Sequence, residues 1–128
     1  MKIGYVDSSC VVAIALTEPG HEVVAARLAD FDRIVSSNLL EAEFLAALAR
    51  EGVRHEDPVP GGITWVIPDR PLHAEIRTIL GARRLRGADL WHLACALYLS
   101  PDPRELPFIT LDQQQAAVAA AIGFPTIG

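Results

Sequence analysis

Several acidic residues in this sequence stand beside apolar segments, where an uncompensated charge is costly to bury. Asp7 follows the strand formers IGYV, and Asp112 follows FITL. Asp89 begins the apolar run DLWHLACALYL, while Glu41 and Glu43 lie within LLEAEFLAAL. Carboxylates that meet at one place repel one another, and a bound cation relieves that repulsion. Ligation by oxygen alone is typical of Mg²⁺ or Mn²⁺, and such a site can polarise a phosphate and activate water for hydrolysis.

Each of these acids also has a plainer explanation. Asp7, Asp89 and Asp112 each lie at the start of an expected helix and could serve as its N-cap. Glu41 and Glu43 could be solvated, because only one face of a helix is usually buried. At about 100° per residue both glutamates border the apolar arc of their helix, so the helical period does not choose between them.

The elements that would position the acids alternate along the chain. Strands are expected at 2–6, at 32–36, within GITWVIPD before Pro68, within PFITLD and at 125–127. Helices are expected at 8–17, 21–30, 39–51, 71–82, 88–99 and 113–123. Ser8 or Ser9 could cap the first helix, and Asn38 could cap the third. A Pro/Gly-rich stretch at 53–62 is expected to be a flexible loop.

This alternation predicts an α/β fold over residues 1–128 as one domain, with three α/β/α layers around a mainly parallel sheet of four or five strands. In such sheets ligands bind at the carboxyl ends of the strands. Asp7, Asp69 and Asp112 each follow a predicted strand and are therefore expected at that edge.

Composition excludes some classes of protein. The net charge of −5 does not suit a protein that coats nucleic acid by bulk positive charge. Cys10 and Cys95 lie in apolar runs without the spacing of a zinc site, which indicates buried thiols in a reducing compartment. The sequence shows neither a signal peptide nor an apolar run of about 18 residues, so a soluble cytoplasmic protein is expected.

Four segments in order are similar to the four motifs of PIN-domain ribonucleases, most closely the VapC-type toxins of bacterial toxin–antitoxin pairs. They are YVDSSC, SSNLLEAEFLAALAR, LRGADLWHLACAL and FITLD. The fit of FLAALAR to the end of the second motif selects Glu43 rather than Glu41. Trp91 departs from the family, which usually has a small or another apolar residue there, and we expect it to pack.

The resemblance implies a metal-dependent endoribonuclease that uses one or two Mg²⁺ or Mn²⁺ ions to cleave RNA. The implied metal-binding and catalytic residues are Asp7, Glu43, Asp89 and Asp112. Asp7 and Asp89 would bind metal directly, Glu43 directly or through water, and Asp112 at a second ion.

Residues around these acids could support them. Ser9 and Thr110 could orient the carboxylates. His92 lies one helical turn after Asp89, as a core histidine or as a support for the site. The densest basic cluster consists of Arg83, Arg84 and Arg86. It could be a solvated helix end or a binding site for RNA phosphates.

The resemblance further implies an RNA substrate, a cognate antitoxin and a homodimer. VVAIALTE and LLEAEFLAAL could supply a groove and a dimer surface, although core packing also explains most of their residues. A PIN-domain RNA-processing nuclease outside a toxin–antitoxin pair and a catalytically silent PIN-like binding module are alternatives. A phospho-acceptor receiver domain is disfavoured, because the chain's only lysine is Lys2.

Overall fold

The computed structural model describes residues 1–54 and 62–127. Its strands are β1 (Ile3–Val6), β2 (Arg33–Ser37), β3 (Ile63–Val66), β4 (Phe108–Ile109) and β5 (Thr126–Ile127). Its α-helices are α1 (Ser8–Ala15), α2 (His21–Ala29), α3 (Leu39–Arg50), α4 (His73–Ala82), α5 (Gly87–Leu99) and α6 (Gln113–Ile122). A short 3₁₀ helix, Pro103–Glu105, precedes β4.

Within the described residues the five strands form one parallel sheet in the order β3-β2-β1-β4-β5. The strand order changes direction at β1, because β2 and β3 extend the sheet on one side and β4 and β5 on the other. A crevice at the carboxyl ends of the strands is expected at such a point. Asp7 directly follows β1 and therefore lies at it.

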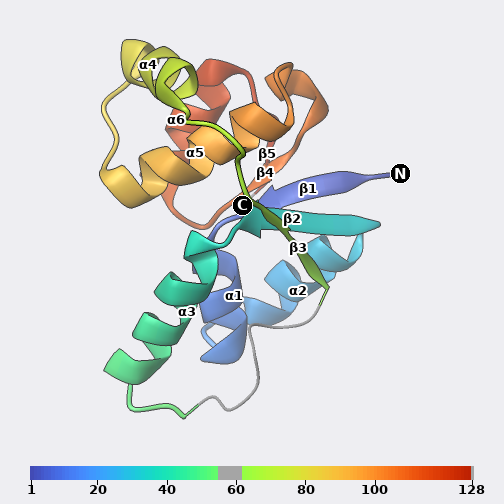
Figure 1. Ribbon diagram of the computed structural model, residues 1–128. Helices are drawn as coiled ribbons and strands as arrows, with labels where there is room; N and C mark the ends of the chain where they lie inside the picture. The colour runs from blue at the N-terminus through green and yellow to red at the C-terminus, as the bar shows by residue number, and fades with distance from the viewer. Residues whose placement is uncertain (55–61, 128) are drawn as a thin grey trace.

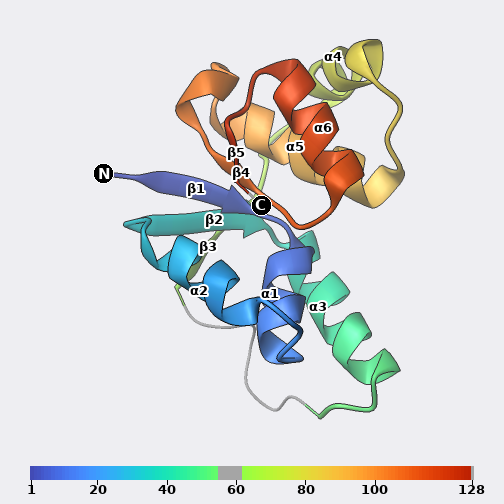
Figure 2. The same cartoon turned by 180° about the vertical axis from the view of Figure 1, so that it is seen from behind.

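Helices cover both faces of the sheet. Figures 1 and 2 show α1, α2 and α3 on one face and α4, α5 and α6 on the other. The predicted three-layer α/β/α arrangement and parallel sheet are confirmed. The helices that carry the candidate acids thus come from both outer layers.

Successive side chains of β1 point to opposite faces of the sheet and pack against both helix layers. Tyr5 packs in the cluster under α4, α5 and α6, whereas Val6 packs in the cluster under α1, α2 and α3. Gly4 lies where the second cluster comes closest, since a Cβ there would be 2.8 Å from Phe31 and 2.9 Å from Ile109. This strand is therefore clamped between two apolar cores, which fixes the direction in which it ends.

Some predicted helix ends are wrong in detail. The N-cap of α1 is Asp7 rather than Ser8 or Ser9, because its carboxylate accepts the hydrogen bond of the Ser9 amide. Asn38 is the N-cap residue of α3, as predicted, but its side chain makes no capping hydrogen bond. The Ser37 hydroxyl accepts the Leu39 amide instead, at 3.1 Å.

Other helix ends shift by one or two residues. The first helix ends at Ala15 and the fourth begins at His73, two residues inside the predicted limits at each of these ends. Of the predicted flexible loop at 53–62, residues 55–61 lie outside the described residues.

Both cysteines are free and buried, on opposite faces of the sheet. Burial raises the pKa of the Cys10 thiol to about 12 and that of Cys95 to about 11. These thiols are therefore protonated and unreactive near neutral pH. In the described part of the chain, no helix has the length and apolar character needed to cross a membrane.

Candidate active site

Asp7 stands at the carboxyl end of β1 with only 4% of its surface exposed. Its Oδ1 accepts hydrogen bonds from the Ser9 amide at 3.1 Å and the Ser9 hydroxyl at 2.5 Å. Its Oδ2 accepts a 2.5 Å hydrogen bond from the Thr110 hydroxyl. Burial raises the pKa of Asp7, although these donors lower it. The carboxylate is therefore held in one orientation in a place where its charge is costly.

The segment after β4 is tied to this carboxylate. Thr110 Oγ1, which donates to Asp7, also accepts the Asp112 amide at 3.0 Å. Asp112 in turn caps α6, because its Oδ1 accepts the Gln115 amide at 3.0 Å. Asp7 and Asp112 are thus both helix caps, as the plainer explanation expected, and Thr110 joins their segments.

Asp89 lies in the first turn of α5 but is not its N-cap, since Arg86 occupies that position. No group among the described residues donates a hydrogen bond to its carboxylate. Partial burial raises the pKa of Asp89, and the negative charges of Asp112 and Glu43 raise it further. Because such repulsion weakens with distance, the carboxylates of Asp89, Asp112 and Glu43 lie near one another.

Glu43 is joined to a buried chain of polar groups. Its Oε1 lies 2.5 Å from His92 Nε2, and His92 Nδ1 lies 2.8 Å from the Tyr5 hydroxyl. The Tyr5 oxygen also accepts the Ser37 amide at 3.0 Å. A carboxylate oxygen accepts, so His92 Nε2 carries the hydrogen of its contact with Glu43. His92 is thus a fully buried core residue and also a contact of Glu43, whereas Glu41 is exposed.

Two contributors to this arrangement were not predicted, Tyr5 and Gln115. Gln115 is fully buried, and its Nε2 donates to the Asp89 backbone oxygen at 3.2 Å. The D-x-x-Q pattern at 112–115 is typical of a helix N-terminus, but it does not indicate this contact with α5. For Tyr5 a signal was available, because strand alternation places residues 5 and 7 on the same side of β1.

Asp89, Asp112 and Glu43 form what we call the acidic cluster, and Thr110 links it to Asp7. Other predicted residues lie outside this cluster. Asp69 follows β3, two strands from β1, and its carboxylate accepts a 2.9 Å hydrogen bond from Tyr98. Arg83 and Arg84 are exposed at the end of α4. Arg86 lies closer, since its charge lowers the pKa of Asp89.

The family model of the PIN domain matches residues 4–121. The chain belongs to the PIN domain family. PIN domains are generally nucleases, and those nucleases typically use divalent metal ions. Searches of curated proteins and of solved structures gave no significant match. The matched range extends from β1 to α6 and includes every candidate acid.

The acids of this PIN domain suit a divalent cation by their chemistry. Within residues 1–54 and 62–127, no group of three or more His, Cys, Asp or Glu side chains is arranged to hold an ion as it stands. Asp7 has both oxygens hydrogen-bonded, and Glu43 Oε1 is bonded to His92. The two oxygens of Asp89, Oδ2 of Asp112 and Oε2 of Glu43 accept no hydrogen bond from a described residue. Oxygen donors under mutual repulsion fit Mg²⁺ or Mn²⁺.

Trp91, the departure from the usual PIN motif, does more than pack. Its Nε1 donates a 3.1 Å hydrogen bond to Ser37 Oγ. Since the Ser37 amide donates to Tyr5, this indole braces the same end of β2 that supports the Glu43 chain. Trp91 therefore adds a hydrogen bond next to the candidate site.

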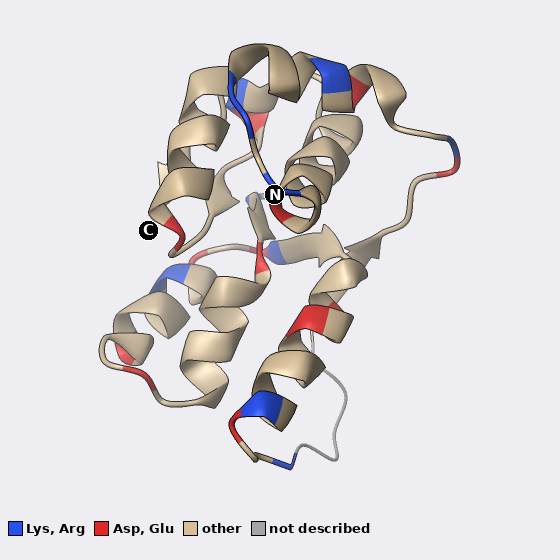
Figure 3. Cartoon of the chain, turned by 90° about the vertical axis from the view of Figure 1, so that its left-hand side faces the viewer, with Lys and Arg blue, Asp and Glu red and all other residues tan. Residues whose placement is uncertain are grey.

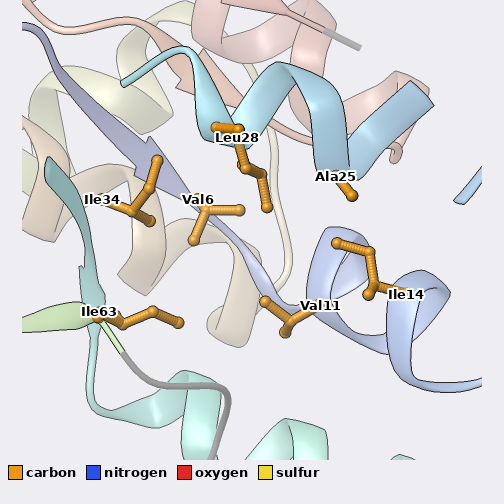
Figure 4. A pocket seen from close by; sticks show the side chains of 9 residues that line it. Val6, Val11, Ile14, Ala25, Leu28, Ile34 and Ile63 are labelled. Carbon is orange, nitrogen blue, oxygen red and sulfur yellow. The ribbon is translucent and has the colours of Figure 1, made fainter. Parts of the chain in front are cut away.

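A pocket elsewhere in the PIN domain lacks the acidic side chains of the candidate site. It lies between the sheet and the α1 and α2 helices, has a volume of about 310 Å³, and is lined by aliphatic residues and Gly62. Figure 4 shows Val6, Val11, Leu28 and Ile63 pointing into it. Without a polar side chain on its walls, it offers no ligand for a metal ion and no donor for a phosphate.

Proposed function

We propose that this PIN domain is a divalent-metal-dependent endoribonuclease. The observation that supports it best is that the charges of Asp112 and Glu43 act on Asp89, while Gln115 is hydrogen-bonded to both the Asp112 carboxylate and the Asp89 backbone. Thr110 connects this group with Asp7. Together these four acids would hold one or two Mg²⁺ or Mn²⁺ ions at the carboxyl ends of β1 and β4.

The chain's own residues would keep the acids in place during the reaction. Ser9 and Thr110 restrain Asp7 through three hydrogen bonds, and His92 restrains Glu43 through one. Oriented carboxylates of this kind lose little entropy when they bind. When bound, the metal would polarise the RNA phosphodiester and lower the pKa of the attacking water.

The first test is cleavage of total RNA with Mg²⁺ or Mn²⁺ and with excess EDTA. We expect cleavage with metal only, and a loss of more than about a hundredfold in Asp89→Asn and Glu43→Gln. Asp69→Asn and Glu41→Gln are matched controls, because they remove equal charge outside the cluster, and both should cleave normally. Undiminished cleavage in EDTA, or equal rates in cluster and control variants, would contradict the nuclease assignment.

We further propose that the nuclease is the toxin of a toxin–antitoxin pair, with a cognate antitoxin and a homodimeric state. The support is the resemblance of the four motifs. Expressing the wild-type chain alone should arrest growth, whereas Asp89→Asn should not. A short upstream reading frame for an antitoxin should neighbour its gene. If wild type and Asp89→Asn leave growth equally untouched, an RNA-processing nuclease or a silent binding module becomes the better explanation.

A further inference from the structure

A groove between α1 and α3 opens beside the candidate active site. It has a volume of about 370 Å³, and its walls are Ser8, Ser9, Val12, Glu43, Ala46, Ala47 and Arg50. The positions from α3 follow the spacing i, i+3, i+4, i+7, so they form one face of that helix. Glu43 belongs to the acidic cluster and Ser9 is hydrogen-bonded to Asp7, so the groove begins at the candidate site.

The groove changes charge along its length. Arg50 is seven residues after Glu43, which corresponds to about 10 Å along a helix axis. Figure 3 shows acidic positions in the first half of α3 and a basic position at its C-terminal end. Arg50 is exposed and has no ion pair or hydrogen bond with any described residue. The Ser8 hydroxyl also has no hydrogen-bond partner among the described residues.

We propose that this groove binds the RNA strand next to the cleaved bond, with Arg50 contacting a phosphate a nucleotide or two away. The inference rests on the proposed nuclease function. A guanidinium matches the paired oxygens of a phosphate, and it stays charged at every working pH. Ala46 and Ala47 project little from α3, which leaves space for ribose between the two helices.

The position of the groove favours RNA over an acidic protein segment. An RNA strand whose scissile phosphate lies at the acidic cluster must leave that cluster along the surface, and this groove starts there. Arg86, whose charge acts on Asp89, belongs to the other helix layer. Arg50 and Arg86 would thus contact phosphates on two sides of the cleaved bond.

The test measures RNA binding in a chain that does not cleave. With Asp89→Asn as background, the affinity for a fluorescent single-stranded oligoribonucleotide is followed by anisotropy over a range of salt concentrations. Arg50→Ala should weaken binding several-fold and reduce the slope of log K against log salt by about 0.7, the value for one phosphate contact to a single strand. Arg50→Lys should keep the slope, because it keeps the charge. Ala46→Phe should weaken binding while Arg50 is intact.

The matched control is Arg77→Ala, which removes another exposed arginine that lies on α4, outside the groove. It should leave affinity and slope unchanged. Equal slopes for Arg50→Ala and Arg77→Ala would overturn the inference. It would also be overturned if the groove binds an acidic protein segment instead, so that Arg50→Ala loses binding of polyglutamate, used as a probe, but keeps RNA binding. These results are separate from the proposed function. If the wild type cleaves RNA but Arg50→Ala leaves affinity and slope unchanged, only the groove proposal is refuted. If Arg50→Ala reduces the slope but the wild type does not cleave RNA, only the nuclease proposal is refuted.

Discussion

His92 lies between an acidic neighbour and a neutral one. Its Nε2 donates to the Glu43 carboxylate, and its Nδ1 is hydrogen-bonded to the Tyr5 hydroxyl, whose oxygen also accepts the Ser37 amide. Every member of this chain other than Glu43 is buried with its hydrogen bonds satisfied. The orientation of one carboxylate thus depends on an uncharged hydroxyl in the opposite layer of the core.

Replacing Tyr5 by Phe tests this dependence. The ring would keep its stacking on Phe108, at 5.2 Å between centroids, and lose only the hydroxyl. We expect a fall of about 1–3 kcal/mol in the free energy of unfolding, since the Ser37 amide loses its acceptor. The RNA cleavage rate at saturating substrate should fall about tenfold with KM unchanged. Urea unfolding and single-turnover cleavage measure the two effects.

The matched control for this change is Tyr98→Phe, which removes a hydroxyl bonded to the exposed Asp69. It should cleave like the wild type. A ¹⁵N NMR spectrum of His92 adds a direct readout, because Tyr5→Phe should disturb the Nε2–H tautomer. If the two tyrosine variants cleave equally and the tautomer is unchanged, the hydroxyl does not position Glu43.

At the scale of elements, helix α6 begins with a residue whose two carboxylate oxygens differ in their partners. Asp112 Oδ1 caps the helix through the Gln115 amide, while Oδ2 has no partner among the described residues. A cap and a metal ligand are therefore compatible in one side chain, because each needs a different oxygen.

Two substitutions at Asp112 separate these uses. Asp112→Ala should lower the free energy of unfolding by about 1 kcal/mol through loss of the cap, and should also reduce RNA cleavage. Asp112→Ser keeps a capping oxygen, so its stability should remain close to wild type while cleavage falls as in the alanine variant. Urea unfolding and an RNA cleavage assay give both values. Full cleavage by Asp112→Ser would show that the residue is a cap alone.

At the scale of the whole molecule, the acids make folding depend on pH. The pKa values of Asp7 and Asp89 are raised above the ordinary 3.8, mainly by burial. The metal-free folded chain therefore holds these protons more tightly than the unfolded chain. Their contribution to stability is present below the ordinary pKa and is lost as the pH rises through the raised values.

Metal binding should reverse this loss, because ions bind the deprotonated carboxylates. The difference in Tm between chains in Mn²⁺ and in EDTA should be small near about pH 4 and should grow toward about pH 7. At an ion concentration of 100 Kd, the stabilisation amounts to about 2.7 kcal/mol. Thermal unfolding followed by circular dichroism measures it, with Glu41→Gln as a control that should behave like wild type. A difference independent of pH would contradict binding at the acids.

Much of this molecule was predictable from local sequence. The fold class and the ends of β1 and β4 follow from apolar patterns and flanking residues, and these ends place Asp7 and Asp112. The support for the acids was less predictable, because Tyr5 and His92 are 87 residues apart and Gln115 contacts Asp89 across 26 residues. Whether Asp7 was a cap or a partner of the other acids could not be decided from spacing, since in the folded chain it caps α1 and is also linked to Asp112 through Thr110.

The order of strands in the sheet bears on how the protein is made. β4 pairs with β1, yet it is the segment Phe108–Ile109, and Thr110 and Asp112 follow it. A growing chain has no partner for that edge of β1 until Phe108 and Ile109 have been synthesised. The proposed metal site could therefore assemble only after the chain has been translated beyond Asp112, so the order of strands would delay any activity until the site's last acid has been added.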